Sequence, residues 1–571
     1  MEEDFLRKVI RSSILSLQKK GELDEFEIPE ISLEHPKEYI HGDTSTPISA
    51  SIAKITGKEP FEIAQKISKE IKSHNISSIR ESTVAKPIFN NFYFSKDFFI
   101  DNIKGILKNK NFGKNQNLKN KKVIIEYTDP NVLKEFHIGH LMSNSIGESL
   151  SRIFEFNGAK IRRANYQGDV GLHVAKAIWG KKNMTPPPVS DKIKDWGLAY
   201  QFGSKMYEED EQVKKEINEI NKKVYDRSDS EINVLYDSGK KISLEYFGKI
   251  YKQLGTKFDK LFFESEIYEI GKKIVEDGSK KEIFEKGEKG AIIFKGEKYG
   301  LHTRVFVNSE GLPTYEAKEL ALAKVKYDKY KYDQSVIITG NEINEYFKVL
   351  LSVMSQIFPD LEKKTKHIGH GMMRLPEGKM SSRTGKVVTF EYLLNKVEEL
   401  VKEKIKNRDL SETEKIEITE KVAIGALKYS ILKQSIGSDI IYDFDKSISF
   451  EGDSGPYLQY SLTRALSVLN KAKSERIKQS FKNIPDQLSN LEKIMHRFPE
   501  VVEKAGKEYE PHFIVLYLTE LAREFNNYYA KNKIVDKTDE FSPYKVALTE
   551  AFSIIMKNGL WLLGINSLEK M

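Results

Sequence analysis

Two histidines three residues apart mark the part of this sequence with the clearest chemical potential. Residues 129–144 read DPNVLKEFHIGHLMSN, so His137 and His140 enclose Gly139, and Lys134 lies just upstream. Imidazoles in such a pair can hydrogen-bond triphosphate oxygens and stabilise charge on an α-phosphorus under attack, without forming a covalent bond. Gly139 leaves room for a nucleotide base or ribose beside the backbone. Taken alone, a histidine pair of this spacing is more often structural or metal-binding.

A second polar stretch supplies hydrogen-bond donors about 240 residues later in the chain. Residues 378–390 read GKMSSRTGKVVTF, and the donors in this stretch are Lys379, Ser381, Ser382 and Arg383. Mobile donors of this kind suit a pyrophosphate leaving group. Taken alone, the stretch reads as a basic surface loop. Together with the histidine pair it indicates a triphosphate ligand, with Mg²⁺ arriving on the nucleotide and no dedicated metal site.

The histidines are expected where a strand turns into a helix. VIIEY at 123–127 is typical of a buried strand, and Met142, Ile146, Leu150 and Ile153 then recur at helical spacing. The stretch KIRRANYQ brings the next strand, so residues 121–167 predict one βαβ unit of a parallel sheet. The amides of a helix N-terminus attract phosphate at such a turn, and open parallel sheets bind ligands there.

The rest of the chain falls into segments of different pattern. Residues 1–115 combine helical periodicity with a short aromatic strand, FNNFYFS, which indicates a small α+β domain. The parallel-sheet domain covers 116–390, and TPPP at 185–188 breaks its pattern and predicts a helical insertion over about 181–290. The sheet strands are expected to resume with AIIF, RVFV, SVIIT and KHIGHG.

Beyond residue 391 the pattern is helical. A connecting region is expected over 391–450 and an all-α domain over 451–571. One apolar stripe in the last domain consists of Ile514, Leu518, Leu521, Phe525 and Tyr528.

Composition removes several classes of protein. A length of 571 residues predicts three or four domains. The chain has no cysteine, which excludes disulfides, thiolate zinc sites and cysteine nucleophiles. The 92 basic and 84 acidic residues leave a net charge of only +8, which supports a polyanionic partner weakly. No apolar signal core or run of about 18 apolar residues is visible, so we expect a cytoplasmic protein without a membrane partner.

The paired HIGH and KMSSR motifs on a split α/β domain resemble the signatures of class I aminoacyl-tRNA synthetases. EYTDPNVLKEFHIGHLMSNSIGESL, ANYQGDVG at 164–171 and GPYLQYSLTR at 455–464 resemble segments of the arginyl-tRNA synthetase family. This resemblance runs from end to end. It implies ATP-dependent activation of L-arginine to arginyl-adenylate and transfer to the 3′-terminal ribose of tRNA(Arg), with tRNA bound before adenylate forms.

The same resemblance assigns the expected parts. It implies a Rossmann-type parallel-sheet catalytic domain with an inserted helical segment, an N-terminal α+β domain that contacts the tRNA elbow, a stem-contact region over 391–450 and a C-terminal anticodon-binding domain. The family's expectation for the oligomeric state is a monomer. A class I synthetase of another specificity, a catalytically silent tRNA-binding relative and another kind of nucleotidyltransferase remain the alternatives.

A site for arginine must pair a guanidinium with planar carboxylates. Glu126 ends the first strand, and Glu319 lies one helical turn beyond Tyr315, on the same helix face. Asn131 can hold the α-amino or carboxylate group of the substrate. By resemblance these four residues fall on arginine-binding positions, and Asp169 lines the floor of the site, although it can equally cap the following helix.

Three departures from the family concern this site. Glu319 stands where the family usually has Asp, which puts specificity in question. A family glutamine is absent, and either Asn341 or Glu342 can replace it. The loop KMSSR lacks the second lysine of KMSKR, and the resemblance implies that Lys134 supplies this charge near the phosphates.

Aromatic residues in the two outer domains are candidates for RNA contact. Single-stranded RNA is read by base stacking and edge contacts, which Tyr528, Tyr529 and Lys531 can provide for the anticodon. Phe89 and Asn91 are the candidates in the N-terminal domain. Packing in a hydrophobic core is the alternative for each aromatic ring.

Overall fold

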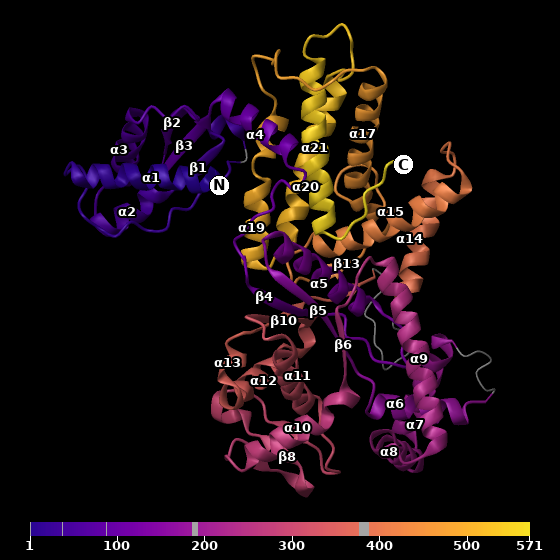
Figure 1. Cartoon of the computed structure of the whole chain (residues 1–571). Coiled ribbons are helices and arrows are strands. Elements are labelled where there is room, and N and C mark those ends of the chain that lie inside the picture. Colours follow the sequence, from indigo (N-terminus) through magenta and orange to yellow (C-terminus); the bar gives the residue numbers. More distant parts are fainter. Residues whose placement is uncertain (1, 37, 87, 186–191, 376–387) are drawn as a thin grey trace. The chain divides into compact units, whose positions relative to one another are not determined.

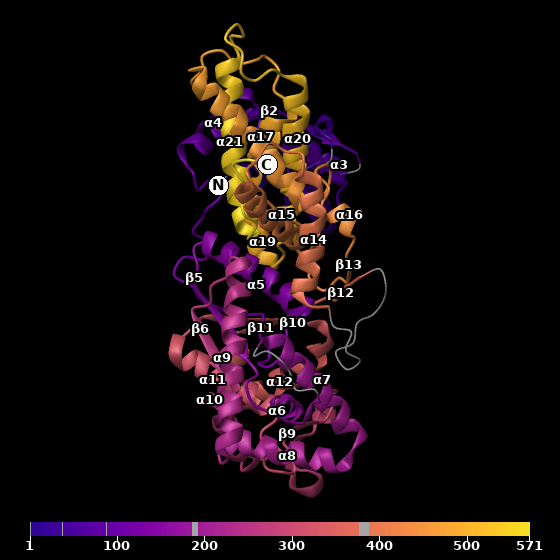
Figure 2. The ribbon, with the colours of Figure 1, turned by 90° about the vertical axis from the view of Figure 1, so that its right-hand side faces the viewer.

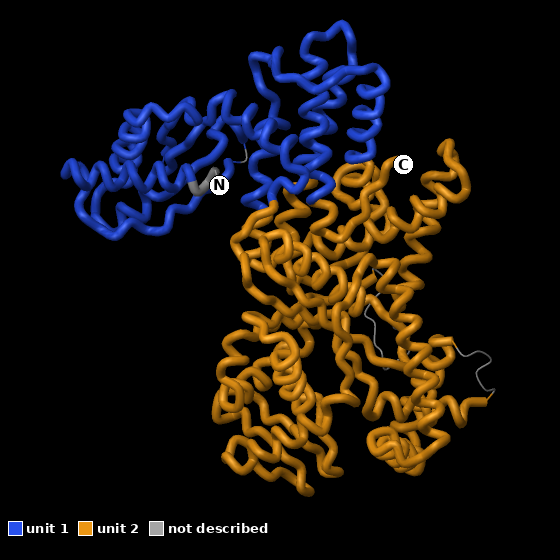
Figure 3. Tube along the Cα trace, viewed as in Figure 1, with its two compact units in different colours: residues 1–113, 461–501, 520–558 blue, residues 114–460, 502–519, 559–571 orange. Residues whose placement is uncertain are grey.

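The computed structural model describes residues 2–36, 38–86, 88–185, 192–375 and 388–571. The chain forms two compact units (Figure 3). Unit 1 contains residues 1–113, 461–501 and 520–558, and unit 2 contains residues 114–460, 502–519 and 559–571. Each unit therefore combines segments that are far apart in the sequence.

The N-terminal part of unit 1 is an α+β fold, as predicted. Its antiparallel sheet has the order β1-β3-β2, and Ile10, Ile14, Ile67 and Phe92 are completely buried in its core. Ser95 starts α4 as an N-cap, because its hydroxyl accepts a hydrogen bond from the Phe98 N–H. The elements are α1 (Glu2–Lys19), β1 (Thr44–Thr46), α2 (Ile48–Thr56), α3 (Pro60–Ser73), β2 (Ile79–Ala85), β3 (Phe89–Phe94) and α4 (Lys96–Lys108).

The C-terminal segment is helical, also as predicted. All five residues of the apolar stripe are buried, which confirms its assignment to a core. The helices are α17 (Gly455–Ser474), α18 (Asn490–Met495), α19 (Phe498–Glu508), α20 (His512–Lys531) and α21 (Ser542–Leu562).

Unit 2 is organised by a five-stranded parallel sheet (Figure 1). The strands are β4 (Lys122–Glu126), β5 (Lys160–Gln167), β6 (Lys260–Phe263), β10 (Gln334–Gly340) and β11 (Thr365–His370). Their order is β11-β10-β4-β5-β6. The chain therefore runs outward from β4 on one side and returns to its other side with β10, which is the strand order of a Rossmann-type sheet and confirms the predicted fold class. The topological switch point, where such sheets bind ligands, lies between β4 and β10.

Helices cover this sheet and extend from it. Helix α5 forms the first crossover, and α6, α7 and α8 pack against one another and against α9 in one helical group (Figure 2). The helices up to α12 are α5 (Ile138–Phe156), α6 (Leu172–Asn183), α7 (Ile193–Glu209), α8 (Glu211–Asp226), α9 (Ser230–Gln253), α10 (Glu264–Ser279), α11 (Tyr315–Tyr330) and α12 (Asn344–Ile357). They are followed by α13 (Pro359–Glu362), α14 (Phe390–Ile405), α15 (Glu412–Leu432) and α16 (Phe444–Ser447). None of the helices within the described ranges is long and apolar enough to cross a membrane.

Three details of the sheets correct the sequence prediction. Strand β6 lies inside the expected insertion over about 181–290, yet it pairs with β5 in the main sheet. AIIF and RVFV do not continue that sheet, because they fall in β8 (Ile292–Phe294) and β9 (Arg304–Val307), which form an antiparallel sheet with β7 (Glu285–Lys286). One short strand, β13 (Ile440–Ile441), lies beyond residue 391 and pairs with β12 (Met373–Arg374). Apolar runs of two to four residues carry too little periodicity to assign them to a sheet. The domain boundaries at 115, 390 and 450 remain predictions.

Candidate active site

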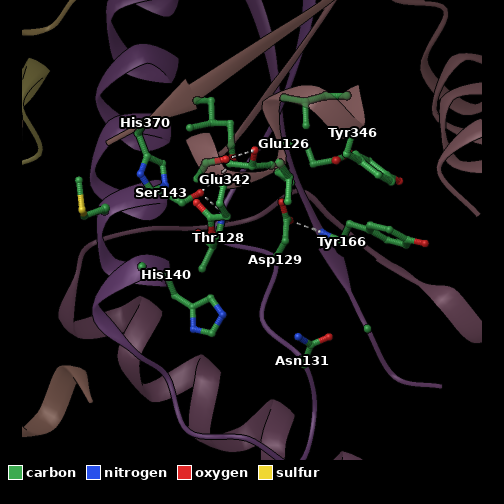
Figure 4. A pocket seen from close by; sticks show the side chains of 18 of the residues that line it. Glu126, Thr128, Asp129, Asn131, His140, Ser143, Tyr166, Glu342, Tyr346 and His370 are labelled. Atoms are coloured by element: carbon green, nitrogen blue, oxygen red, sulfur yellow. Dashed lines mark hydrogen bonds between the residues drawn. The ribbon is translucent and has the colours of Figure 1, made fainter. Parts of the chain in front are cut away.

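A cavity of about 960 Å³ opens at the carboxyl ends of β4 and β10, at the topological switch point (Figure 4). This volume is in the usual range for a small-molecule site, roughly 300–1,000 Å³. The predicted residues that line it are Glu126, Asn131, His137, Gly139, His140, Tyr315 and Glu319. The structure therefore brings together residues that are up to 193 positions apart in the sequence, from Glu126 to Glu319.

The loop between β4 and α5 has an unusual backbone that shapes the cavity. Thr128, Asp129 and Leu133 have φ of 83°, 44° and 64°, in the left-handed region that side chains other than glycine rarely adopt. Backbone strain of this kind concentrates at functional sites. The Thr128 N–H donates to the Ser143 hydroxyl, which itself donates to the Ile338 carbonyl, so this loop is tied to α5 and to β10.

Asn131 lies close against the neighbouring strand connection. A Cβ atom added at Gly168 would lie 2.1 Å from Asn131 Oδ1, so only glycine permits this approach. Tyr166 and Tyr346 also line the cavity, and their hydroxyls are buried without a hydrogen-bond partner among the described residues.

The two predicted histidines cap helix α5 with their own rings. His137 Nδ1 accepts a hydrogen bond of 3.2 Å from the Gly139 N–H, and His140 Nδ1 accepts one of 3.2 Å from the His137 N–H. The rings stack with centroids 3.6 Å apart. A Cβ at Gly139 would lie 3.0 Å from the His137 ring, so this glycine also makes the capping geometry possible. Because each Nδ1 accepts, each neutral ring carries its proton on Nε2 and can donate from there.

Burial keeps both imidazoles neutral. It lowers the pKa of His137 to about 4, helped by repulsion from Lys134. Burial, with repulsion from His137 and Lys134, also holds the pKa of His140 well below its usual value. The helix N-terminus therefore presents neutral hydrogen-bond donors to an anion, and the positive end of its dipole adds to the attraction.

Lys134 lies near the histidines but does not line the cavity. Its Nζ sits 4.0 Å from the centroid of the Tyr200 ring in α7, a cation–π contact. The same lysine lowers the pKa of the Tyr200 hydroxyl, against the effect of burial. In this structure its charge is therefore held beside α7, and its predicted role at the phosphates remains a prediction.

Substitution of Lys134 by methionine tests that role. We expect adenylate formation to slow about tenfold, equivalent to ~1.4 kcal/mol, because one charged partner of the phosphates is lost. The dissociation constant for tRNA should stay nearly unchanged. Single-turnover adenylate formation and filter binding of tRNA measure the two quantities, and a defect confined to tRNA binding would contradict the phosphate role.

Two buried ion pairs stand among the acidic residues of the cavity. Glu126 accepts a hydrogen bond of 2.7 Å from Lys326 of α11, and both side chains are at most 2% exposed. Glu264 pairs in the same way with Lys318, also of α11. Glu319 has no ion pair with any described residue, and burial together with repulsion from Glu126 raises its pKa to about 8.

Several residues of the cavity were not predicted from the sequence. Glu264, Asp129, His370 and the ion pair of Arg304 with Glu316, 3.4 Å apart, all contribute to the cavity wall. Glu264 directly follows β6, so recognition of KLFF as a sheet strand would have placed this acid at the ligand-binding edge. For Asp129 and His370 the sequence signal was weaker: it consisted only of a position just after a sheet strand or at its end.

Asp169 does not line the cavity, which corrects the prediction of a floor residue. Its side chain is completely buried, and it accepts hydrogen bonds from the Tyr236 hydroxyl at 2.9 Å and from Lys240 Nζ at 2.6 Å. It also accepts from the Ser265 N–H at 2.8 Å and from the Ser265 hydroxyl at 2.6 Å. Asp169 therefore caps α10 rather than the helix that follows it, and it ties α9 to α10.

We expect Asp169→Asn to act on stability rather than on chemistry. The substitution removes the charge opposite Lys240 and places an amide N–H₂ donor among groups that themselves donate. The free energy of unfolding should therefore fall by about 1–3 kcal/mol. Thermal unfolding measures this change. A kcat that falls by more than about tenfold at 25 °C in the folded variant would instead indicate direct contact with substrate.

The second motif lies largely outside the described residues. Lys379, Ser381, Ser382 and Arg383 belong to residues 376–387, about which the structure says nothing. The flanking residues Arg374 and Val388 both line the cavity. The Ile138 N–H donates to the Val388 carbonyl at 3.2 Å, so the chain leaves the motif directly beside the histidine pair.

The predicted RNA-contacting residues divide by exposure. Tyr529 is 40% exposed, and Lys531 is exposed as well. Tyr528 is buried in the core and Asn91 is buried in β3, so neither offers a surface to RNA, and Phe89 is partly exposed. For Tyr528 the structure therefore favours core packing over base stacking, as expected for a residue in phase with the apolar stripe of α20.

Comparisons with known proteins agree along the whole chain. Residues 102–444 match the model of the class I tRNA synthetase (R) catalytic domain, residues 4–94 that of the arginyl tRNA synthetase N-terminal domain, and residues 458–571 that of the DALR anticodon binding domain. The arginine–tRNA ligase of Clostridium acetobutylicum is 32% identical, over 94% of this chain and 96% of its own length. That of Borrelia hermsii is 31% identical, over 100% and 98% respectively.

A solved structure shows the same fold. Thermus thermophilus arginyl-tRNA synthetase superposes with a TM-score of 0.79 at 21% identity, and the match covers 100% of both chains. The catalytic-domain model covers more than half of this sequence, and the relatives match it over nearly its full length. With the histidine pair at the switch point of a Rossmann-type sheet, these matches establish that the chain belongs to the class I arginyl-tRNA synthetase family.

Proposed function

We propose that this protein is an arginine–tRNA ligase, which activates L-arginine with ATP and transfers it to the 3′-terminal ribose of tRNA(Arg). Family membership supports this function. The observation that carries it is the combination, in one cavity, of two neutral imidazole donors at a helix N-terminus with a group of carboxylates. The imidazole donors suit a nucleoside triphosphate, and the carboxylates suit a guanidinium.

In the first step, a carboxylate oxygen of arginine attacks the α-phosphorus of MgATP. The new P–O bond gives arginyl-adenylate, the bond to the bridging oxygen breaks, and pyrophosphate leaves with Mg²⁺. His137 and His140 donate from Nε2 to the phosphate oxygens, whose charge increases in the transition state. Lys379, Ser381, Ser382 and Arg383 are proposed to hold the leaving group. Positioning and electrostatics provide the catalysis, and no covalent enzyme intermediate is needed.

In the second step, the 2′-hydroxyl of the terminal ribose attacks the carbonyl carbon of the adenylate. The new ester bond forms, the bond to phosphate breaks, and AMP leaves, while the hydroxyl proton passes to the released phosphate or to solvent. Residues 451–571 are proposed to read the anticodon, with Tyr529 and Lys531 as the exposed candidates. Residues 1–115 are proposed to contact the tRNA elbow. The proposed location is the cytoplasm, and the proposed active form is a monomer.

A charging assay with each of the twenty amino acids on total tRNA tests the function. We expect ester formation with arginine only, dependent on ATP and Mg²⁺. Charging with another amino acid would show a different class I specificity. This outcome is the main alternative, because Glu319 stands where the family usually has Asp. Binding of tRNA without charging by any amino acid would identify a catalytically silent relative.

A further inference from the structure

The carboxylates at the inner end of the cavity outnumber their cations. Glu126, Asp129 and Glu319 interact electrostatically with one another, and Lys326 is the only cation that forms an ion pair with any of them within the described part of the chain. Lys326 Nζ is bonded to Glu126 Oε2. If all three acids were ionised, the group would therefore carry two uncompensated negative charges in a largely buried place.

Asp129 is held in this group by its backbone. Its φ of 44° lies in the left-handed region, directly after Thr128 with φ of 83° and directly before Pro130. Asp129 Oδ1 accepts a hydrogen bond of 2.7 Å from the Tyr166 N–H of β5 (Figure 4). Its Oδ2 has no hydrogen-bond partner among the described residues. The residue is only partly buried and lines the cavity, so this oxygen is available to a ligand.

The groups that face Asp129 come from four elements, and they act in both directions: the acids favour a bound proton on Asp129, whereas Lys326 and the hydrogen bond from the Tyr166 N–H oppose it. Glu126 comes from β4, Glu319 and Lys326 come from α11, Tyr166 comes from β5, and Tyr251 comes from α9. Burial, followed by repulsion from Glu126 and Glu319, raises the pKa of Asp129 well above its usual value. Lys326 is the only cation in this set, and the two tyrosines carry no charge at neutral pH.

We propose that the two carboxyls of Asp129 and Glu319 together bind one proton before substrate binds, that the guanidinium of arginine displaces this proton into solvent, and that Asp129 is thereby a specificity-determining residue. This inference rests on the proposed function, because it takes arginine as the substrate. The charges balance: one positive charge enters with the guanidinium and one leaves as the proton. A neutral side chain of similar shape brings no charge to displace the proton and so gains nothing from the pair.

The arginine KM as a function of pH tests this proposal, in the charging reaction at saturating ATP and tRNA. The guanidinium stays protonated throughout the range from pH 6 to 9. For the unmodified chain, log KM should fall with a slope approaching −1 as pH rises, and then level off above the apparent pKa of the pair. A profile that is flat over this range would overturn the proposal.

Asp129→Asn separates proton sharing from a structural role. Asparagine keeps the Oδ1 acceptor for Tyr166 and tolerates a positive φ, so the loop should be preserved. Because the substitution removes one repelling carboxylate, the break in the profile, which is the pH at which log KM levels off, should fall by at least one pH unit. An unmoved break would exclude Asp129 from the proton site.

Glu316→Gln is the matched control, because it removes a carboxylate of the same cavity that pairs with Arg304 rather than with this group. The pH at which its log KM levels off should stay within about 0.3 pH unit of that for the unmodified chain. If the unmodified chain charges no arginine at any pH, the proposed function itself fails. Arginine charging with a flat profile contradicts only the inference about Asp129.

Discussion

Replacement of His140 by alanine is expected to slow arginyl-adenylate formation by on the order of 10²- to 10³-fold, equivalent to about 3–4 kcal/mol of transition-state stabilisation. The reason is geometric. His140 Nδ1 accepts from the His137 N–H, so Nε2 carries the proton and can donate to a phosphate oxygen in the buried cavity. Alanine leaves the charge that develops on the phosphate without this donor. Pyrophosphate exchange in the presence of tRNA measures the rate.

The same variant also loses a cap of α5, and this effect must be separated from the chemistry. Loss of a side-chain cap weakens a helix by roughly 0.5–2 kcal/mol, so the melting temperature should fall by a few degrees. An assay at 25 °C on the folded variant then reports on turnover alone. His173→Asn is a control, since His173 is buried beside the site and bonded to the Gly168 carbonyl but does not line the cavity. Turnover of His140→Ala close to that of this control would remove the histidine from the mechanism.

Replacement of Glu319 by glutamine is expected to raise the arginine KM by on the order of 10²-fold or more, equivalent to about 3–4 kcal/mol. Glu126 is already paired with Lys326, so Glu319 is the carboxylate of α11 left to meet a guanidinium. The KM for ATP should change little, because the histidine pair is untouched. Initial rates of charging over a range of arginine concentrations measure the effect.

Glu319→Asp is the matched control for charge. It keeps the carboxylate but shortens the side chain by one methylene, to the residue that the family usually has, so its KM should lie within about tenfold of the unmodified chain. An arginine KM in the glutamine variant equal to that of the aspartate variant would show that the charge at 319 is not used.

Stability gives an independent check on Glu319. Burial and repulsion from Glu126 raise the pKa of Glu319 from 4.5 to about 8 in the folded chain. The folded chain therefore binds more protons than the unfolded chain between about pH 4.5 and 8. Stability contributed by this group is therefore lost as pH rises through that window. Glu319→Gln removes this loss, so the variant should melt at a higher temperature than the unmodified chain at pH 8, with a smaller difference at pH 5.

Much of the fold was accessible from local pattern. VIIEY, KIRRANYQ, SVIIT and KHIGHG all proved to be strands of the parallel sheet, because each is long enough to show a buried run between breaks. The four residues of β6 carry no such signal, and its assignment to the insertion also hid Glu264. Asp169 shows the opposite error, since its motif indicated the site while its side chain bonds to Tyr236, Lys240 and Ser265 in the interior.

The sequence by itself determined which chemical groups the protein has and where the chain turns: a histidine pair at the start of a helix, acids at strand ends, no cysteine, and motifs that resemble one synthetase family. Only the tertiary structure decided how those groups are paired and protonated. The ion pair of Glu126 with Lys326 joins residues 200 positions apart, and the electrostatic repulsion between Asp129 and Glu319 acts between two different elements. Charge pairing and desolvation depend on distances through space, which short-range sequence patterns do not encode.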